Sequence, residues 1–231
     1  MGGSPVPRPP RTGGRGTLLR TRPRTKEPGL PIDIVRPPKR HTLAPAKQRI
    51  LDTADKLFYD EGVRAVGIDR LIAVSSVTKA TFYKHYGSKD RLIVEYVAYR
   101  HLQFAEAIDA AAQATDDPEV LLREIAAAQA RMIVGPGFRG CPFLNVATEF
   151  TDPAHPVRRA VEHHREWFHA LLESLLRELD HPMPGDAADD LVLAHDGAMA
   201  GGYAGDAIAA AASLQRMYDR VLASVPARAA A

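Results

Sequence analysis

The sequence predicts an all-α fold. Apolar residues recur at every third or fourth position along most of residues 42–224, which is the spacing of one face of a helix. Proline, glycine and N-capping residues divide this pattern into segments of helical length. No segment carries the two-residue alternation of a strand, and no repeat of fixed period is visible. We therefore expect helices and no strands.

Composition excludes several classes of protein. A chain of 231 residues, of which 45% are hydrophobic and 25% charged, is long enough for one core or two small ones. The single cysteine, Cys141, excludes an internal disulfide and a cysteine-rich zinc module. The sequence has neither an apolar run of about 18 residues nor the apolar core of a secretory signal. These features predict a cytoplasmic protein without a membrane-spanning segment.

Charge is distributed unevenly along the chain. Residues 1–47 contain 11 Lys and Arg against two acidic residues, a net charge of +9. Residues 48–91 contain eight cations and six acids (+2), whereas residues 92–231 contain 11 cations and 20 acids (−9). A polyanionic partner is therefore expected at the N-terminal end.

Residues 1–41 form a basic leader rich in Pro, Arg, Gly and Thr. The leader has too few aliphatic residues to offset the entropy of ordering, so we expect it to be disordered. Two interpretations stay open. The leader is either an arm that follows a DNA backbone or enters a minor groove, or a solvated tail that is dispensable, for example the product of an upstream start codon.

The first helix is expected from Thr42 to Gly62. Pro45 is tolerated in its first turn, where an N–H group has no partner within the helix, and Gly62 suits a C-cap. The predicted buried stripe of this helix consists of Ile50, Leu51, Ala54, Leu57 and Phe58.

Residues 67–92 predict two short helices across a tight turn. The first begins near Ile68 and ends where residues 75–76 interrupt the apolar pattern. Thr78 can cap the second, which is expected from Lys79 to about His85. Two short helices joined in this way form a helix-turn-helix.

The second short helix is rich in groups that can contact phosphate. No acidic residue lies between Asp69 and Asp90, and a third helix opens at Ser88 with free amides that also favour a phosphate. The cationic and hydroxyl donors of the second helix are Lys79, Thr81, Tyr83, Lys84 and His85.

The run VTKATFYKHYGSKDRLI, with RILDTADKLFYDEGVRAVGIDRLI before it, resembles the DNA-binding domain of the tetracycline-repressor (TetR) family of transcription regulators. The resemblance extends from Lys47 to about Val97 without a gap. It implies that the second short helix is the recognition helix, which lies in a major groove. The sequence departs from the family at Ser76, where a turn glycine is usual, and a positive φ costs serine more than glycine.

The resemblance implies a set of DNA contacts. We expect Lys79 and the exposed side of its helix to approach base edges, whereas Tyr83 and Lys89 mainly contact phosphate, as do Thr81 and Lys84. The complete predicted set is Lys47, Thr78, Lys79, Ala80, Thr81, Tyr83, Lys84, His85 and Lys89.

The rest of the chain predicts a helical body. Helices are expected at about 88–114, 118–134, 155–179, 187–203 and 206–224, with a further short helix within residues 138–150. In the resembling family the helix at 88–114 joins the DNA reader to the body, and its swing carries the signal. The predicted inner face of the helix at 118–134 consists of Val120, Leu121, Ile125, Ala128 and Met132. That of the helix at 155–179 consists of Val157, Val161, His164, Phe168, Leu171, Leu172, Leu175 and Leu179.

The last two helices are rich in small residues, from Gly197 to Ala212. Small residues let helices approach closely, and the family's dimer is a four-helix bundle made from these two helices and their mates. We therefore expect a homodimer. The predicted domains are a helix-turn-helix domain (42–91), an effector-binding and dimerisation domain (92–226) and a tail (227–231).

Isolated polar and aromatic groups on apolar helices are typical of a ligand pocket, although each alone fits a packed core better than a ligand contact. The predicted effector contacts lie where the family binds small molecules. They are Phe138, Cys141, Asn145, Glu149, Trp167, Phe168, His195, Met199 and Tyr203, with Arg139 beside them. Residues 138–150 are expected to transmit ligand binding to the helix at 88–114.

Metal, redox and enzyme chemistry are not predicted. His163 and Glu166 share a helix face, but His164 and His169 point elsewhere, and there is no HExxH motif. Cys141 fits an inert buried side chain better than a reactive thiol. There is no GxSxG motif and no glycine-rich phosphate loop after a strand, so no catalytic residue, metal ligand or cofactor is assigned.

The sequence thus predicts a homodimeric, ligand-responsive transcriptional regulator, a repressor, whose partners are a palindromic double-stranded DNA operator and a small molecule. Two alternatives stay open: a regulator without a small-molecule effector, and a helical binding protein that senses metal or oxidant.

Overall fold

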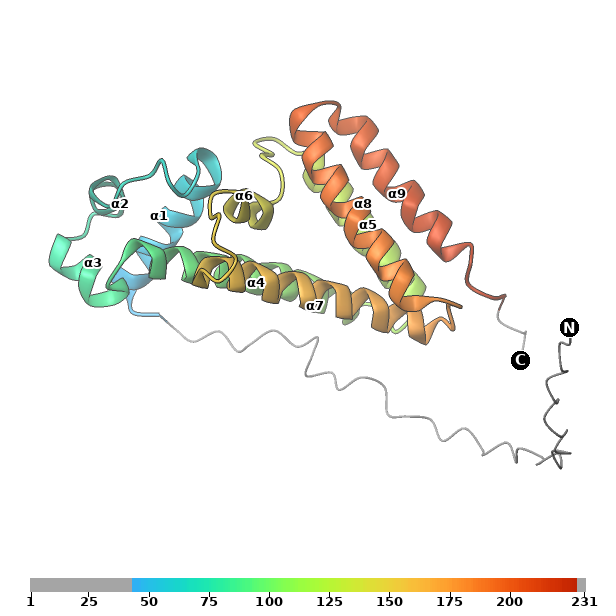
Figure 1. Ribbon diagram of the computed structural model, residues 1–231. Coiled ribbons are helices and arrows are strands. Elements are labelled where there is room, and N and C mark those ends of the chain that lie inside the picture. Colours follow the sequence, from blue (N-terminus) through green and yellow to red (C-terminus); the bar gives the residue numbers. More distant parts are fainter. Residues whose placement is uncertain (1–42, 228–231) are drawn as a thin grey trace, which may run out of the picture.

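A computed structural model describes residues 43–227 of the chain. These residues form nine helices and no strand, which confirms the predicted all-α fold (Figure 1). The predicted leader at 1–41 and most of the predicted tail at 227–231 lie outside the described residues.

Three helices form a compact head: α1 (Pro45–Glu61), α2 (Ile68–Ser75) and α3 (Lys79–Tyr86). The five residues predicted as the inner face of α1 are all buried. Leu71 of α2 and Phe82 of α3 are fully buried against them, so one small core holds the three helices together.

The helix-turn-helix is formed as predicted. Ser76 follows α2 with φ 52° and ψ 47°, so a serine occupies the left-handed position where the resembling family usually has glycine. Thr78 caps α3, since its Oγ1 accepts a hydrogen bond from the Thr81 N–H at 3.1 Å.

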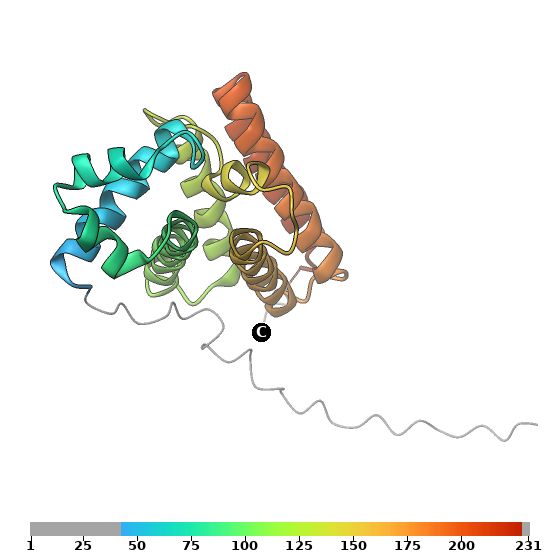
Figure 2. The same ribbon diagram turned by 60° about the vertical axis from the view of Figure 1, so that its left-hand side comes forward.

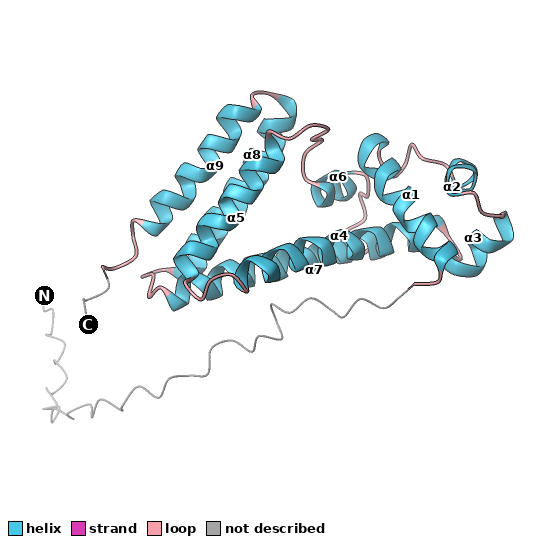
Figure 3. Ribbon diagram, turned by 180° about the vertical axis from the view of Figure 1, so that it is seen from behind, coloured by secondary structure: helices cyan, strands magenta, loops and turns pink. Residues whose placement is uncertain are grey.

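The remaining helices form an elongated body. α4 (Lys89–Ala112) and α7 (Pro156–Glu178) lie side by side along the molecule and reach from the head to its far end (Figures 1 and 3). α5 (Pro118–Ile133), α8 (Pro184–Ala204) and α9 (Ala207–Leu222) pack together beside them. The short α6 (Pro142–Thr148) lies between the head and α8 (Figure 2).

The predicted inner face of α7 is correct, because all eight of its residues, including Leu179 just after the helix, are buried. That of α5 is partly wrong, since Val120, Ala128 and Met132 are exposed. Both sides of α5 carry apolar or alanine residues, so its neighbours decide which side is buried. It packs on α9, α7, α4 and α8, which cover a face formed by Leu121, Leu122, Ile125, Ala126, Gln129, Ala130 and Ile133.

Within residues 43–227, no helix is both long enough and apolar enough to cross a membrane.

Replacing Ser76 by glycine is expected to raise the free energy of unfolding by about 1 kcal/mol, because glycine adopts the left-handed conformation without a steric cost from Cβ. Urea unfolding followed by circular dichroism measures the change. Ser76→Ala is the matched control, since it keeps Cβ and should bring no gain. Equal stabilisation by both variants would contradict a strained turn.

Candidate functional site

Helix α3 presents one face to solvent. Phe82 and Tyr86 hold the opposite face against the head, and the Tyr86 hydroxyl donates to the Lys47 carbonyl oxygen at 2.8 Å. Two of the predicted DNA contacts on or next to α3, Thr81 and His85, are half-buried. The others are exposed on the free face: Thr78, Lys79, Ala80, Tyr83 and Lys84.

Acidic side chains of the protein itself do little to neutralise the lysines on the free face of α3. Lys79 lies 3.9 Å from Asp69, but both side chains are exposed, and such a pair contributes little. Lys84 has no ion-pair partner within the described part of the chain. The arrangement therefore offers cations and hydroxyls to an anionic partner, as a recognition helix requires.

Two of the predicted DNA contacts, Lys47 of α1 and Lys89 of α4, lie outside α3. The Lys47 ammonium contacts Glu95 of α4 at 2.7 Å and lies over the Tyr86 ring at 5.2 Å. The Lys89 ammonium donates to the Arg64 carbonyl oxygen at 3.3 Å. Burial lowers the pKa of Lys89, against the smaller opposing effect of nearby carboxylates. Both lysines thus connect elements of the protein, and their contact with DNA stays a prediction.

Two side chains join the head to the segment around α6. The Tyr59 hydroxyl of α1 donates to the Gly140 carbonyl oxygen at 3.0 Å and accepts from the Arg139 N–H at 2.9 Å. The Glu149 carboxylate accepts from the Val63 N–H at 3.0 Å and the Arg64 N–H at 2.7 Å. We call these four hydrogen bonds the head–body junction.

Glycine is required at the junction. Gly62 has φ +93°, and a Cβ there would lie 3.0 Å from a Glu149 carboxylate oxygen. The role of Tyr59 was not predicted from the sequence. An aromatic residue on a helix does not indicate a hydrogen-bond partner 80 positions away.

Four of the predicted effector contacts meet where α6 approaches α8. Gly140 is surrounded by Asn145 Oδ1, the Met199 carbonyl oxygen and Tyr203 Cβ, each 3.6 Å from the position of a Cβ. Phe138 packs on the same part of α8, at Gly202. The guanidinium of Arg139 lies 5.4 Å from the Tyr203 ring centroid, and the Asn145 amide donates to the Arg139 carbonyl oxygen at 2.7 Å.

Trp167, Phe168 and His195 belong to a second cluster, which is formed by side chains of α4, α6, α7 and α8. Phe168 contacts the His195 ring edge-on at 5.5 Å, and Trp167 contacts His101 in the same way at 5.0 Å. His101 and His164 share a hydrogen bond between their Nδ1 atoms at 3.1 Å, and the sequence analysis did not anticipate this pair.

Glu149 lies apart from both clusters, because its carboxylate is engaged at the head–body junction. Its assignment as an effector contact stays a prediction, as do those of the other eight residues.

Burial controls the titration of the body's polar groups. Desolvation raises the pKa of the Cys141 thiol to about 11, so the thiol is protonated at neutral pH and is a poor nucleophile. It lowers the pKa of His164 to about 2 and that of His195 to about 4, so both rings are neutral. Among the described residues, no three His, Cys, Asp or Glu side chains are placed to hold a metal ion.

Lys84→Ala is expected to weaken binding to all DNA sequences alike and to make the negative slope of log K against log salt shallower by about 0.9, the contribution of one phosphate contact. Fluorescence anisotropy at several salt concentrations measures the slope. Arg177→Ala, which removes an equal charge from the far end of α7, should leave the slope unchanged. An unchanged slope for Lys84→Ala would rule out its phosphate contact.

Glu149→Gln is expected to reduce the free energy of unfolding by about 2 kcal/mol. Glutamine has one acceptor oxygen for two amides, and its own NH₂ group would face a backbone donor. Chemical denaturation measures the loss. Glu162→Gln, an exposed change on α7, is the control and should have little effect. Equal stabilities of the two variants would contradict the importance of the junction.

Known proteins match both parts of the molecule. A family model for bacterial regulatory proteins of the tetR family matches residues 50–96. The HTH-type transcriptional regulator LmrA of Bacillus subtilis is 25% identical over 136 residues, which cover 56% of this chain and 71% of LmrA.

Solved structures extend the similarity to the body. A TetR-family transcriptional regulator from Streptomyces coelicolor is 38% identical, with a TM-score of 0.75, and the match covers 78% of this chain and 95% of that chain. A TetR-type regulator from Streptomyces avermitilis is 26% identical, with a TM-score of 0.66 and coverage of 77% and 98%.

Proposed function

The chain belongs to the TetR family of bacterial transcriptional regulators, and we propose that it represses transcription as a homodimer that releases a palindromic operator when a small molecule enters its body. DNA binding is the function of the family. The observation that carries the proposal is the free, cationic face of α3, which the head holds away from the core.

A dimer is proposed through α8 and α9. Between these helices lies a groove of about 440 Å³, lined mainly by small residues that include Gly197, Gly201 and Ala209. Leu193 of α8 and Ile208 of α9 are 71% and 76% exposed, although both are large and apolar. A second copy would cover such side chains in a four-helix bundle. Two recognition helices would then meet successive major grooves about 34–36 Å apart.

An effector is proposed to bind where α6, α7 and α8 meet. The His195 Nδ1 and Arg139 Nε atoms are buried and have no hydrogen-bond partner among the described residues. Buried polar atoms without a partner cost about 1–3 kcal/mol each, so a ligand with matching groups gains by supplying them. The proposed contacts remain the nine residues named from the sequence.

The switch is proposed to act through residues 138–150. This segment contributes to the proposed effector site at Arg139 and Asn145, and it holds the head through Gly140 and Glu149. An effector that favours another position of the segment alters the head and hence the spacing of the two recognition helices. A tenfold loss of operator affinity requires about 1.4 kcal/mol of differential binding.

The proposed division of the chain follows from this mechanism. Residues 42–91 form the DNA-binding domain and residues 92–226 the effector-binding and dimerisation domain. Because the proposed partner is operator DNA, the protein is proposed to act in the cytoplasm, without catalytic activity of its own.

A gel-shift titration against the DNA upstream of the protein's own gene tests the proposal. We expect the protein to retain the upstream fragment at a concentration at which a scrambled fragment of the same length stays free. This binding should need no added metal or oxidant. A requirement for metal or oxidant would favour the alternative of a metal or redox sensor. Equal binding to both fragments would contradict operator recognition.

Gly197→Arg is expected to give a monomer whose operator affinity is at least about a hundredfold lower, because two linked heads bind far more tightly than one. A Cβ at Gly197 meets nothing within 4 Å, so the protomer tolerates the change. Sedimentation measures the mass and a gel shift the affinity. Gly185→Arg, equally free of contacts in the protomer, is the control and should stay dimeric. A dimeric Gly197→Arg variant would contradict the α8–α9 interface.

A further inference from the structure

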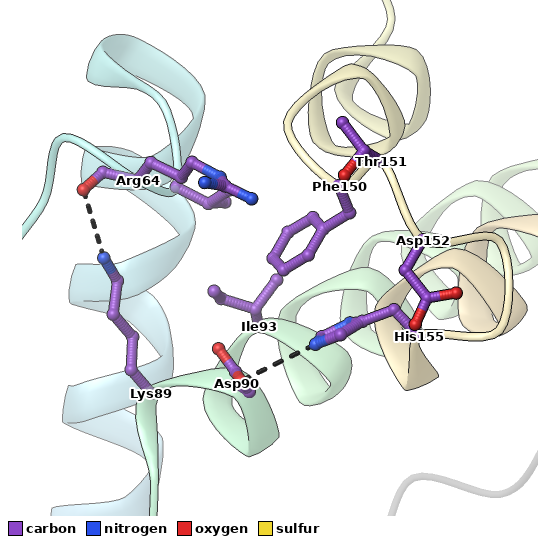
Figure 4. Close-up of a pocket in the computed structure, with 9 residues that line it drawn as sticks. Arg64, Lys89, Asp90, Ile93, Phe150, Thr151, Asp152 and His155 are labelled. Atoms are coloured by element: carbon purple, nitrogen blue, oxygen red, sulfur yellow. Dashed lines mark hydrogen bonds and ion pairs between the residues drawn. The ribbon is translucent and has the colours of Figure 1, made fainter.

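A cleft of about 480 Å³ lies between the head and the body, and none of the nine proposed effector contacts lines it. Three segments line it: the loop between α1 and α2, the first turn of α4, and the connection between α6 and α7 (Figure 4). Its volume lies within the range of small-molecule sites, which is about 300–1,000 Å³. Ile93 and Phe150 provide its apolar wall.

The head side of the cleft is cationic. The Arg64 guanidinium extends into the space above Ile93 and lies 5.4 Å from the Phe150 ring centroid (Figure 4). No ion-pair partner for it exists in the described part of the chain. Lys89 lines the same side, with the Arg64 carbonyl oxygen as the hydrogen-bond acceptor of its ammonium group.

Two carboxylates also line the cleft, on the side of His155. Asp90 lies 3.7 Å from the His155 Nε2 atom, and Asp152 lies beside His155 (Figure 4). One Asp152 oxygen accepts from the Ala154 N–H, and the carboxylate has no ion-pair partner among residues 43–227. Two carboxylates around one histidine leave this side negative whether His155 is neutral or charged.

We propose that this cleft binds a small zwitterion, of the chemical class of a free α-amino acid. Its carboxylate pairs with Arg64, whose planar guanidinium suits bidentate contact with a carboxylate. Its ammonium group faces Asp152 and Asp90. The lining explains the preference, because the cations of Arg64 and Lys89 and the carboxylates of Asp90 and Asp152 give the cleft charges of both signs, which match a zwitterion better than a ligand of a single net charge.

Occupancy of the cleft would affect DNA binding. Arg64 belongs to the head and Asp152 to the body, so a ligand that contacts both favours one orientation of the head. By linkage, operator DNA changes the affinity for the zwitterion by the same factor as the zwitterion changes the affinity for DNA. The inference is independent of the identity of the effector proposed for the body.

The test uses the full chain and the shift in its unfolding temperature at constant ionic strength. The probes are L-alanine, L-leucine and L-glutamine. Each is used at about 10 mM, which is ten times the dissociation constant of a site that binds its ligand with a Kd of about 1 mM. Leucinamide and 4-methylpentanoate lack the carboxylate and the amine of leucine, respectively. We expect at least one amino acid to raise the unfolding temperature, and, for leucine, both analogues to do so less.

Substitutions in the cleft test whether the amino acid binds there. Arg64→Gln and Asp152→Asn should each lower the affinity for the amino acid at least fivefold, whereas Arg159→Gln, an exposed change on α7, should leave it unchanged. The proposal is overturned if no amino acid raises the unfolding temperature, if the analogues act equally well, or if Arg64→Gln responds like Arg159→Gln.

Discussion

The orientation of the head on the body is the constraint on which the rest of the structure depends. Glu149 and Tyr59 fix it through four hydrogen bonds to backbone groups. Arg100 of α4 adds a contact with Asp55 of α1 at 2.5 Å and lies over the Tyr59 ring at 4.9 Å. The partners at the junction are backbone atoms, so the α6 segment contacts the main chain of the head rather than mobile side chains. In the proposed dimer, the spacing of the two recognition helices would depend on this orientation.

The body combines tight packing with incompletely satisfied polar groups. A Cβ at Gly202 would lie 2.5 Å from Ile133, so α5 and α8 approach more closely there than any side chain permits. Elsewhere in the body, the His195 Nδ1 and Arg139 Nε atoms are buried and have no hydrogen-bond partner within the described residues. A packed core normally satisfies such atoms.

The net charge differs between the N-terminal end, the body and the buried interior of the protein. Basic residues are concentrated toward the N-terminal end, and residues 92–231 carry a net charge of −9. The acidic body disfavours contact with DNA except through α3 and its surroundings. In the interior, burial keeps His164 and His195 neutral, so the core contains polar groups without net charge. The cleft at Arg64 and Asp152 differs from both regions, because charges of both signs line it.

The sequence by itself determined the all-α class, the helix-turn-helix and the cationic character of α3. These features depend on local signals: the spacing of apolar residues, the Thr78 cap and a run of residues without acids. It also predicted the buried face of α7, where apolar residues occupy only one side. Tertiary structure alone decided the buried face of α5, which has apolar residues all round. It alone brought Glu149 to the amides of Val63 and Arg64, and His101 to His164. Such contacts join residues more than 60 positions apart, and the periodicity of a helix carries no information about which distant element it meets.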